Sequence, residues 1–123
     1  TGVLQIGVAA PGEPTFDGKI GAYYYWHFPT TMLNFYPWGL SVNVVQPLAA
    51  DRTRVKYLSY VWDASKRSQG PGAGLDRVEQ EDEAVVESVQ RGVRSPFYHR
   101  SRYSPTRETG VHHFHRLLAK FLG

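Results

Sequence analysis

The hydrophobic pattern of the chain changes from a two-residue period to a helical period around residues 65–75. Before this point, short runs rich in β-branched and aromatic residues alternate with turn-like joins, which predicts β-strands. Because joins this short connect antiparallel neighbours only, the strands should form an antiparallel meander. The predicted strands are Gly2–Ala10, Ala22–Phe28, Thr31–Tyr36, Leu40–Leu48 and Arg54–Trp62.

After the change of period, the sequence predicts two helices. The first covers Asp76–Ser95 and begins with several acidic residues, which favour the positive end of the helix dipole. The second covers Val111–Leu122 and gathers its apolar residues on one side. Proline and glycine without a period predict a loop over residues 96–110. The last third of the chain is therefore helical.

These elements predict an α+β fold in a single domain over residues 1–123. We expect a sheet over residues 1–64, a flexible Gly- and Pro-rich link over residues 65–75, and a helical part over residues 76–123. The long helix should pack across the antiparallel sheet, and the C-terminal helix should close one side of it.

Composition narrows the class of protein. A chain of 123 residues that is 41% hydrophobic suits one small core. The net charge of +3 is not gathered into a basic block, so neither nucleic acid nor a membrane surface is an expected partner. The absence of cysteine excludes disulfides and thiolate-held clusters from this chain. With no membrane-length apolar run and no basic N-terminal start, we expect a soluble cytoplasmic protein.

Asp82 is the most informative candidate for chemistry. In helical projection it falls in the middle of an apolar stripe formed by five valines: Val78, Val85, Val86, Val89 and Val93. A lone carboxylate on a buried face loses several kcal/mol of solvation unless a cation, a metal or hydrogen-bond donors meet it.

From spacing alone, two structural explanations of Asp82 compete with a metal-binding role. One is a salt bridge to a residue of the sheet such as Arg52, Arg54 or Lys56. The other is that the rotation of the helix is misjudged, so that Asp82 does not lie on the buried side.

The histidines of the C-terminal helix are a second candidate. His112 and His115 are three residues apart and could share a metal, whereas His113 points elsewhere. No carboxylate at helical spacing completes a ligand set, so capping, packing and solvent contact are the commoner alternatives for all three.

Three ordered segments of the chain resemble a known family. They read YYYWHFPTTMLNFYPWGLSVNVVQPLAADRTRVKYLSYVWD, VEQEDEAVVESVQRGVRS and RYSPTRETGVHHFHRLLAKFL. Together they resemble the C-terminal part of the catalytic domain of the large (alpha) subunit of Rieske-type non-haem iron ring-hydroxylating oxygenases. The branch they are most similar to contains choline and carnitine monooxygenases, and the resemblance runs from about Ala22 onward.

This resemblance implies a helix-grip, START-like domain in which a curved sheet wraps a long helix. It also implies that Asp82 is the carboxylate of an Fe(II) site completed by two histidines, with positions left open for dioxygen and substrate. The aromatic strands would line a pocket for a small apolar or aromatic ligand.

The chain also departs from the family, since it lacks the upstream histidine ligands and the domain that holds the 2Fe-2S cluster. We therefore expect a C-terminal portion of an oxygenase catalytic domain that is inactive by itself and needs an N-terminal oxygenase part. The alternative is a stand-alone, non-catalytic small-molecule-binding module or remnant. Because a partial sheet leaves apolar surface uncovered, we also expect a homo-oligomer.

Overall fold

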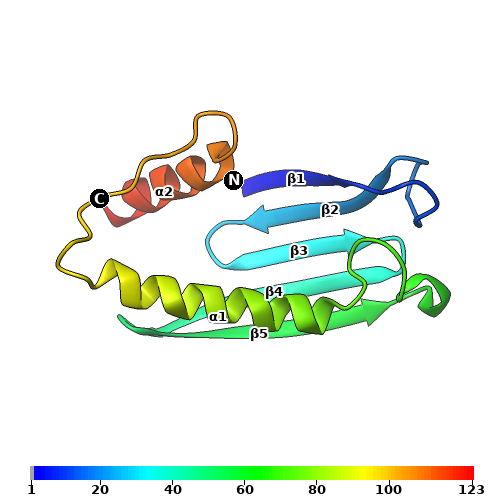
Figure 1. Cartoon of the computed structure of the whole chain (residues 1–123), viewed down its shortest axis with the longest axis horizontal. Helices are drawn as coiled ribbons and strands as arrows, with labels where there is room; N and C mark the ends of the chain where they lie inside the picture. The colour runs from blue at the N-terminus through cyan, green and yellow to red at the C-terminus, as the bar shows by residue number, and fades with distance from the viewer. Residues whose placement is uncertain (1) are drawn as a thin grey trace. The chain divides into compact units, whose positions relative to one another are not determined.

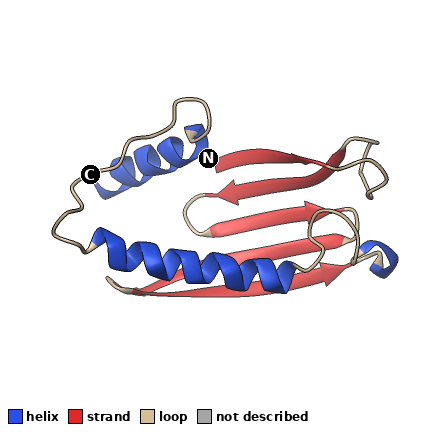
Figure 2. Ribbon diagram, viewed as in Figure 1, coloured by secondary structure: helices blue, strands red, loops and turns tan. Residues whose placement is uncertain are grey.

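The computed structural model describes residues 2–123 and consists of a β-sheet followed by helices (Figures 1 and 2). Its strands are β1 (Gly2–Val8), β2 (Ile20–His27), β3 (Thr31–Tyr36), β4 (Gly39–Ala49) and β5 (Arg52–Val61). Its helices are the short 3-10 helix η1 (Ala64–Lys66) and the α-helices α1 (Leu75–Val93) and α2 (Thr109–Leu122). The predicted strands and helices are confirmed, with ends displaced by one or two residues.

Within the described residues, the strands form one five-stranded antiparallel sheet in the order β1-β2-β3-β4-β5. Each strand pairs with its neighbour in sequence (Figure 1). Short turns join β2 to β3, β3 to β4 and β4 to β5, whereas the longer segment 9–19 joins β1 to β2. The register shifts only near Gly7 and Val8 and between Pro47 and Ala49. The predicted meander and the α+β fold class are confirmed.

The chain divides into two compact units. Unit 1 contains Thr1–Ala73 together with Gly110–Gly123, and unit 2 contains Gly74–Thr109. Unit 1 thus holds the sheet and α2, whereas unit 2 holds α1 and the loop that follows it. The packing of the long helix across the sheet stays a prediction.

In unit 1, α2 packs on one face of the sheet through aromatic contacts. The ring centroids of Phe114 and Trp26 are 4.8 Å apart, and those of Phe121 and Phe28 are 5.6 Å apart. Both pairs are edge to face. Such tilted aromatic pairs add to the stabilisation from apolar burial. The predicted apolar side of the C-terminal helix therefore covers part of the sheet, on the face that we call the α2 face.

The most buried part of unit 1 lies at the end of the sheet where β3 turns into β4. Ala22, Tyr36, Trp38 and Ser41 are at most 3% exposed. The rings of Tyr36 and Trp38 stack in parallel with their centroids 5.1 Å apart.

The segment predicted as a flexible link also packs against this end of the sheet. A Cβ added to Gly72 would lie 2.8 Å from the Tyr36 ring, and the Arg67 guanidinium lies 5.8 Å from the centre of the Trp38 ring. Small residues allow this close approach, which local composition does not predict.

Unit 2 consists of α1 and a loop tied to itself by short hydrogen bonds. Gly74, in the left-handed region with φ 65°, is the N-cap of α1, and Arg77 pairs with Glu81 one turn later at 3.0 Å. In the loop, the Ser104 amide donates to the Glu108 carboxylate at 2.6 Å. Neither α1 nor any other helix in residues 2–123 is both long and apolar enough to cross a membrane.

Candidate functional site

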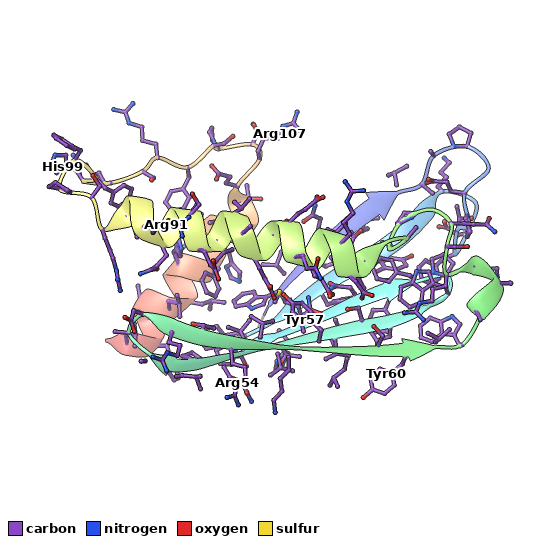
Figure 3. All side chains as sticks on the ribbon, turned by 60° about the horizontal axis from the view of Figure 1, so that its bottom comes forward. Arg54, Tyr57, Tyr60, Arg91, His99 and Arg107 are labelled. Atoms are coloured by element: carbon purple, nitrogen blue, oxygen red, sulfur yellow. The ribbon has the colours of Figure 1, made fainter. Side chains whose placement is uncertain are left out.

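The α2 face of the sheet carries only uncharged side chains in its strands. Because cross-strand partners point to the same face, the register assigns each position to a side. Trp26, Met32 and Tyr57 lie on the α2 face, whereas the strand residues His27, Arg54 and Lys56 lie on the opposite face. In Figure 3, Tyr57 points to one side of β5, and Arg54 and Tyr60 point to the other.

One row of polar side chains crosses the α2 face from β1 to β5. The pairings are Gln5 with Tyr24, Tyr24 with Asn34, Asn34 with Ser41, and Ser41 with Ser59. We call these five residues the polar row. Neighbouring members are about 5 Å apart, so hydroxyl and amide groups form a continuous line across the sheet.

The middle of the polar row is only partly satisfied by internal hydrogen bonds. Ser41 is fully buried, and its hydroxyl donates to the Asn43 amide oxygen at 3.1 Å. The Tyr24 and Tyr36 side chains are also hydrogen-bonded to each other. Half-buried Asn34 makes no side-chain hydrogen bond within residues 2–123. An amide with two donors and one acceptor therefore stays open on this face.

Burial raises the pKa of the Tyr24 phenol above its usual value of 10.0, and the hydrogen bond with Tyr36 partly opposes this shift. The folded state therefore holds the Tyr24 proton more tightly than the unfolded chain does. The stability linked to this proton is complete below pH 10 and is lost as the pH rises through the raised pKa.

We accordingly expect the urea midpoint of wild type to fall more steeply above about pH 10 than that of Tyr24→Phe, which has no proton to lose. Denaturation followed by circular dichroism at a series of alkaline pH values measures this difference. Equal slopes in the two proteins would show that Tyr24 does not cause the alkaline loss.

The structure places Asp82 on the second turn of α1, within unit 2. Because α1 is a regular α-helix, Asp82 lies in the middle of the valine stripe, as the helical projection predicted. Asp82 and the five valines are exposed, with Val86 at 67%. A salt bridge from Asp82 to Arg52, Arg54 or Lys56 would involve a residue of the other unit and stays a prediction, as does its role as a metal ligand.

The most perturbed acid on α1 is Glu79, one turn before Glu83. Partial burial raises the pKa of its carboxyl above the ordinary value, and the nearby charges of Asp76 and Glu83 act in the same direction. Burial is therefore the main cause of the shift, and repulsion among the acids at the start of α1 adds to it.

The three histidines of α2 lie close together in sequence but do not complete a set of three metal ligands. His112, His113 and His115 lie on the first turns of α2, and within the described chain no group of three or more His, Cys, Asp or Glu residues has metal-binding geometry. Phe114 between them faces the sheet, and the His115 ring lies 5.6 Å from the Phe114 ring.

Sequence reasoning did not find the polar row. Its members come one from each of the five strands, and only the register shows that they align. By contrast, the aromatic character of the strands was visible from the sequence.

An antiparallel meander with a helix packed on one face defines an α+β domain. Comparison with known families matches residues 7–123 to the ring hydroxylating alpha subunit (catalytic domain). The chain belongs to this family of oxygenases, as the resemblance of its three segments predicted.

Several curated proteins are similar to the chain. Choline monooxygenase (chloroplastic) of Arabidopsis thaliana is 39% identical over 118 residues, which cover 87% of this chain and 26% of that protein. The corresponding protein of Spinacia oleracea is 32% identical, over 84% of this chain and 24% of its own length. The carnitine monooxygenase oxygenase subunit of Escherichia coli (strain K12) is 32% identical, over 95% of this chain and 36% of its own length.

The chain thus spans about a quarter to a third of the length of the curated relatives it matches. No solved structure matches it significantly.

Proposed function

We propose that the chain is the C-terminal portion of an oxygenase catalytic domain, in which Asp82 supplies one iron ligand and the sheet supplies part of the substrate-binding wall. The family match over residues 7–123 carries this proposal. The position of Asp82 supports it, because an acid centred in an apolar stripe is suited to meet a metal once that stripe is covered.

The described residues do not by themselves fit an iron ion, since none of their acid and histidine side chains form a group of three. The remaining iron ligands and the 2Fe-2S cluster would therefore come from outside these 123 residues. When bound, the iron would supply dioxygen activation, and the part of this chain is to provide the Asp82 carboxylate.

We infer that the substrate is a small quaternary ammonium compound. The names of the relatives point to choline and carnitine, which share a trimethylammonium group. The uncharged aromatic α2 face is compatible with such a cation, because ring faces attract quaternary ammonium groups without a buried carboxylate. The Arg67 guanidinium over the Trp38 ring shows that this unit already contains a cation–aromatic contact.

The alternative is a stand-alone module that binds a small molecule without redox chemistry. The lack of a complete metal-binding group among residues 2–123 favours this alternative for the chain by itself. A homo-oligomer is our further proposal for either case, because Leu4, Ile6 and Tyr60 leave apolar surface on the sheet face opposite α2.

The test of the proposed function is a chimaera in which residues 7–123 replace the matching part of the Arabidopsis choline monooxygenase. We expect the chimaera to hold iron and to consume dioxygen when choline and an electron donor are supplied. Asp82→Ala should lower iron affinity by more than about 100-fold, because it removes a direct ligand rather than a supporting residue.

Glu87→Ala is the matched control, since Glu87 is an exposed acid on the side of α1 away from the valine stripe. It should leave iron content unchanged. A wild-type chimaera that folds without iron, or an Asp82→Ala protein that keeps its iron, would favour the non-catalytic alternative. The 123-residue chain by itself should show no substrate-dependent oxygen consumption.

A further inference from the structure

The polar row differs from its surroundings in a way that the apolar wall proposed above does not explain. On one side it is flanked by Trp26, Met32 and Asn43, and on the other by Tyr36. A sheet face that served only to bind an apolar group would place β-branched or aromatic residues in this row as well. Instead, five consecutive strands each present a hydroxyl or an amide.

We propose that the polar row binds an uncharged hydroxyl group of the ligand, with Asn34 as the contacting residue, and disfavours a carboxylate at the same place. This inference rests on the proposed function, in which the rings of the α2 face bind a quaternary ammonium group. It adds the specificity-determining residues and the chemical group that they recognise.

Asn34 is suited to this contact because it is half-buried and unpaired. Its amide oxygen can accept a hydrogen bond from a hydroxyl, and its NH2 group can donate a hydrogen bond to a hydroxyl oxygen, so a hydroxyl matches both functions. An open amide in a partly desolvated place gains from any ligand that pairs with it and is disfavoured when it stays unpaired. Among residues 2–123, no side chain forms a hydrogen bond with the Asn34 amide.

Ser41 is a positioning residue rather than a contact. Its side chain is fully buried, so a ligand does not reach it, and its hydroxyl donates to Asn43. This bond holds the Asn43 amide beside the row, and Tyr24 is held in the same way by its hydrogen bond with Tyr36. The groups that flank Asn34 are therefore ordered before a ligand binds, which lowers the entropy lost on binding.

The discrimination against a carboxylate follows from charge. The strands place no lysine, arginine or histidine on the α2 face, whereas the opposite face carries His27, Arg54 and Lys56. A carboxylate brought to Asn34 would lose solvation without meeting a strand-borne cation. Arg67, from the link, is engaged over the Trp38 ring at the end of the sheet.

The experiment uses the whole 123-residue chain and three probes in isothermal titration calorimetry. Tetramethylammonium carries only the cation, choline adds a hydroxyl, and glycine betaine carries a carboxylate in place of that hydroxyl. We expect choline to bind about 5-fold more tightly than tetramethylammonium, which is the effect of one net hydrogen bond. Glycine betaine should bind no more tightly than tetramethylammonium.

Asn34→Leu should reduce choline binding to the level of tetramethylammonium and leave tetramethylammonium binding unchanged. Gln46→Leu is the control, because it makes the same amide-to-leucine change on the opposite face of β4. It should keep the preference for choline.

The inference is overturned if choline and glycine betaine bind equally, if the preference for choline survives in Asn34→Leu, or if the folded chain binds none of the probes. The comparison of probes on wild type needs no variant and therefore stands even if Asn34→Leu fails to fold. Failure of the proposed function would be seen separately, as a chimaera without iron or oxygen consumption.

Discussion

Replacing Trp38 by alanine is expected to lower the free energy of unfolding of unit 1 by about 3–5 kcal/mol, the range for removing a large buried aromatic side chain. Trp38 is 1% exposed and stacks on Tyr36 with the two rings 4° from parallel. Its removal would leave a cavity lined by the Tyr36 ring and by the segment around Gly72, at the most buried end of the sheet. Urea denaturation followed by far-ultraviolet circular dichroism measures the loss.

Trp38→Phe is the matched variant, since it keeps a ring at the same position. It also removes the indole N–H, which is buried without a hydrogen-bond partner among residues 2–123. An unpartnered buried donor destabilises a protein by about 1–3 kcal/mol, so its removal offsets part of the lost contact area. The phenylalanine variant should therefore be clearly more stable than the alanine variant. Equal losses would show that ring stacking is not what stabilises this end of the sheet.

Gly72→Ala is expected to destabilise unit 1 by about 2–4 kcal/mol through two separable effects. Gly72 has a positive φ of 84°, which an L-residue adopts with strain. The added Cβ would also lie 2.9 Å from the Trp38 indole nitrogen and 2.8 Å from the Tyr36 ring, so the stacked rings or the link must move.

Gly12→Ala separates the two effects. Gly12 has a φ of 87°, but an added Cβ there would meet no atom within 4 Å. The free energy of unfolding of this variant should fall only by the cost of the backbone conformation, about 1–2 kcal/mol. The difference between the two variants measures the packing of the link on Tyr36 and Trp38. If the variants lose the same stability, the link does not pack tightly in solution.

The strands and helices were predictable from the sequence because their signals are local. The alternation in Thr31–Tyr36 and the acidic start of α1 each follow from a short stretch of chain. The ordered packing of Gly70–Gly72 was not predictable in this way. The same small residues that suit a flexible link also allow a close approach to rings, and only the tertiary structure distinguishes the two.

The candidate site also contains one part that local sequence predicts and one part that only the tertiary structure shows. The place of Asp82 in the valine stripe follows from helical geometry. The resemblance to the oxygenase family implies that Asp82 is a metal ligand, which spacing alone does not, and this role stays a prediction. Asn34 could not be found in the sequence, because its significance depends on being opposite Tyr24 on one side and Ser41 on the other. Register is set by turns and by the pairing of whole strands, so no single strand specifies it.

The meander order of the sheet has a consequence for how the chain reaches its native state. Each strand pairs with the strand next to it in sequence, so the pairings close local loops, of which segment 9–19 between β1 and β2 is the longest. The contact between Phe114 and Trp26, in contrast, joins two residues near opposite ends of the chain. Local contacts form early and distant ones late in folding. Successive hairpins should therefore assemble the sheet first, and the docking of α2 on β2 should be the last step that completes unit 1.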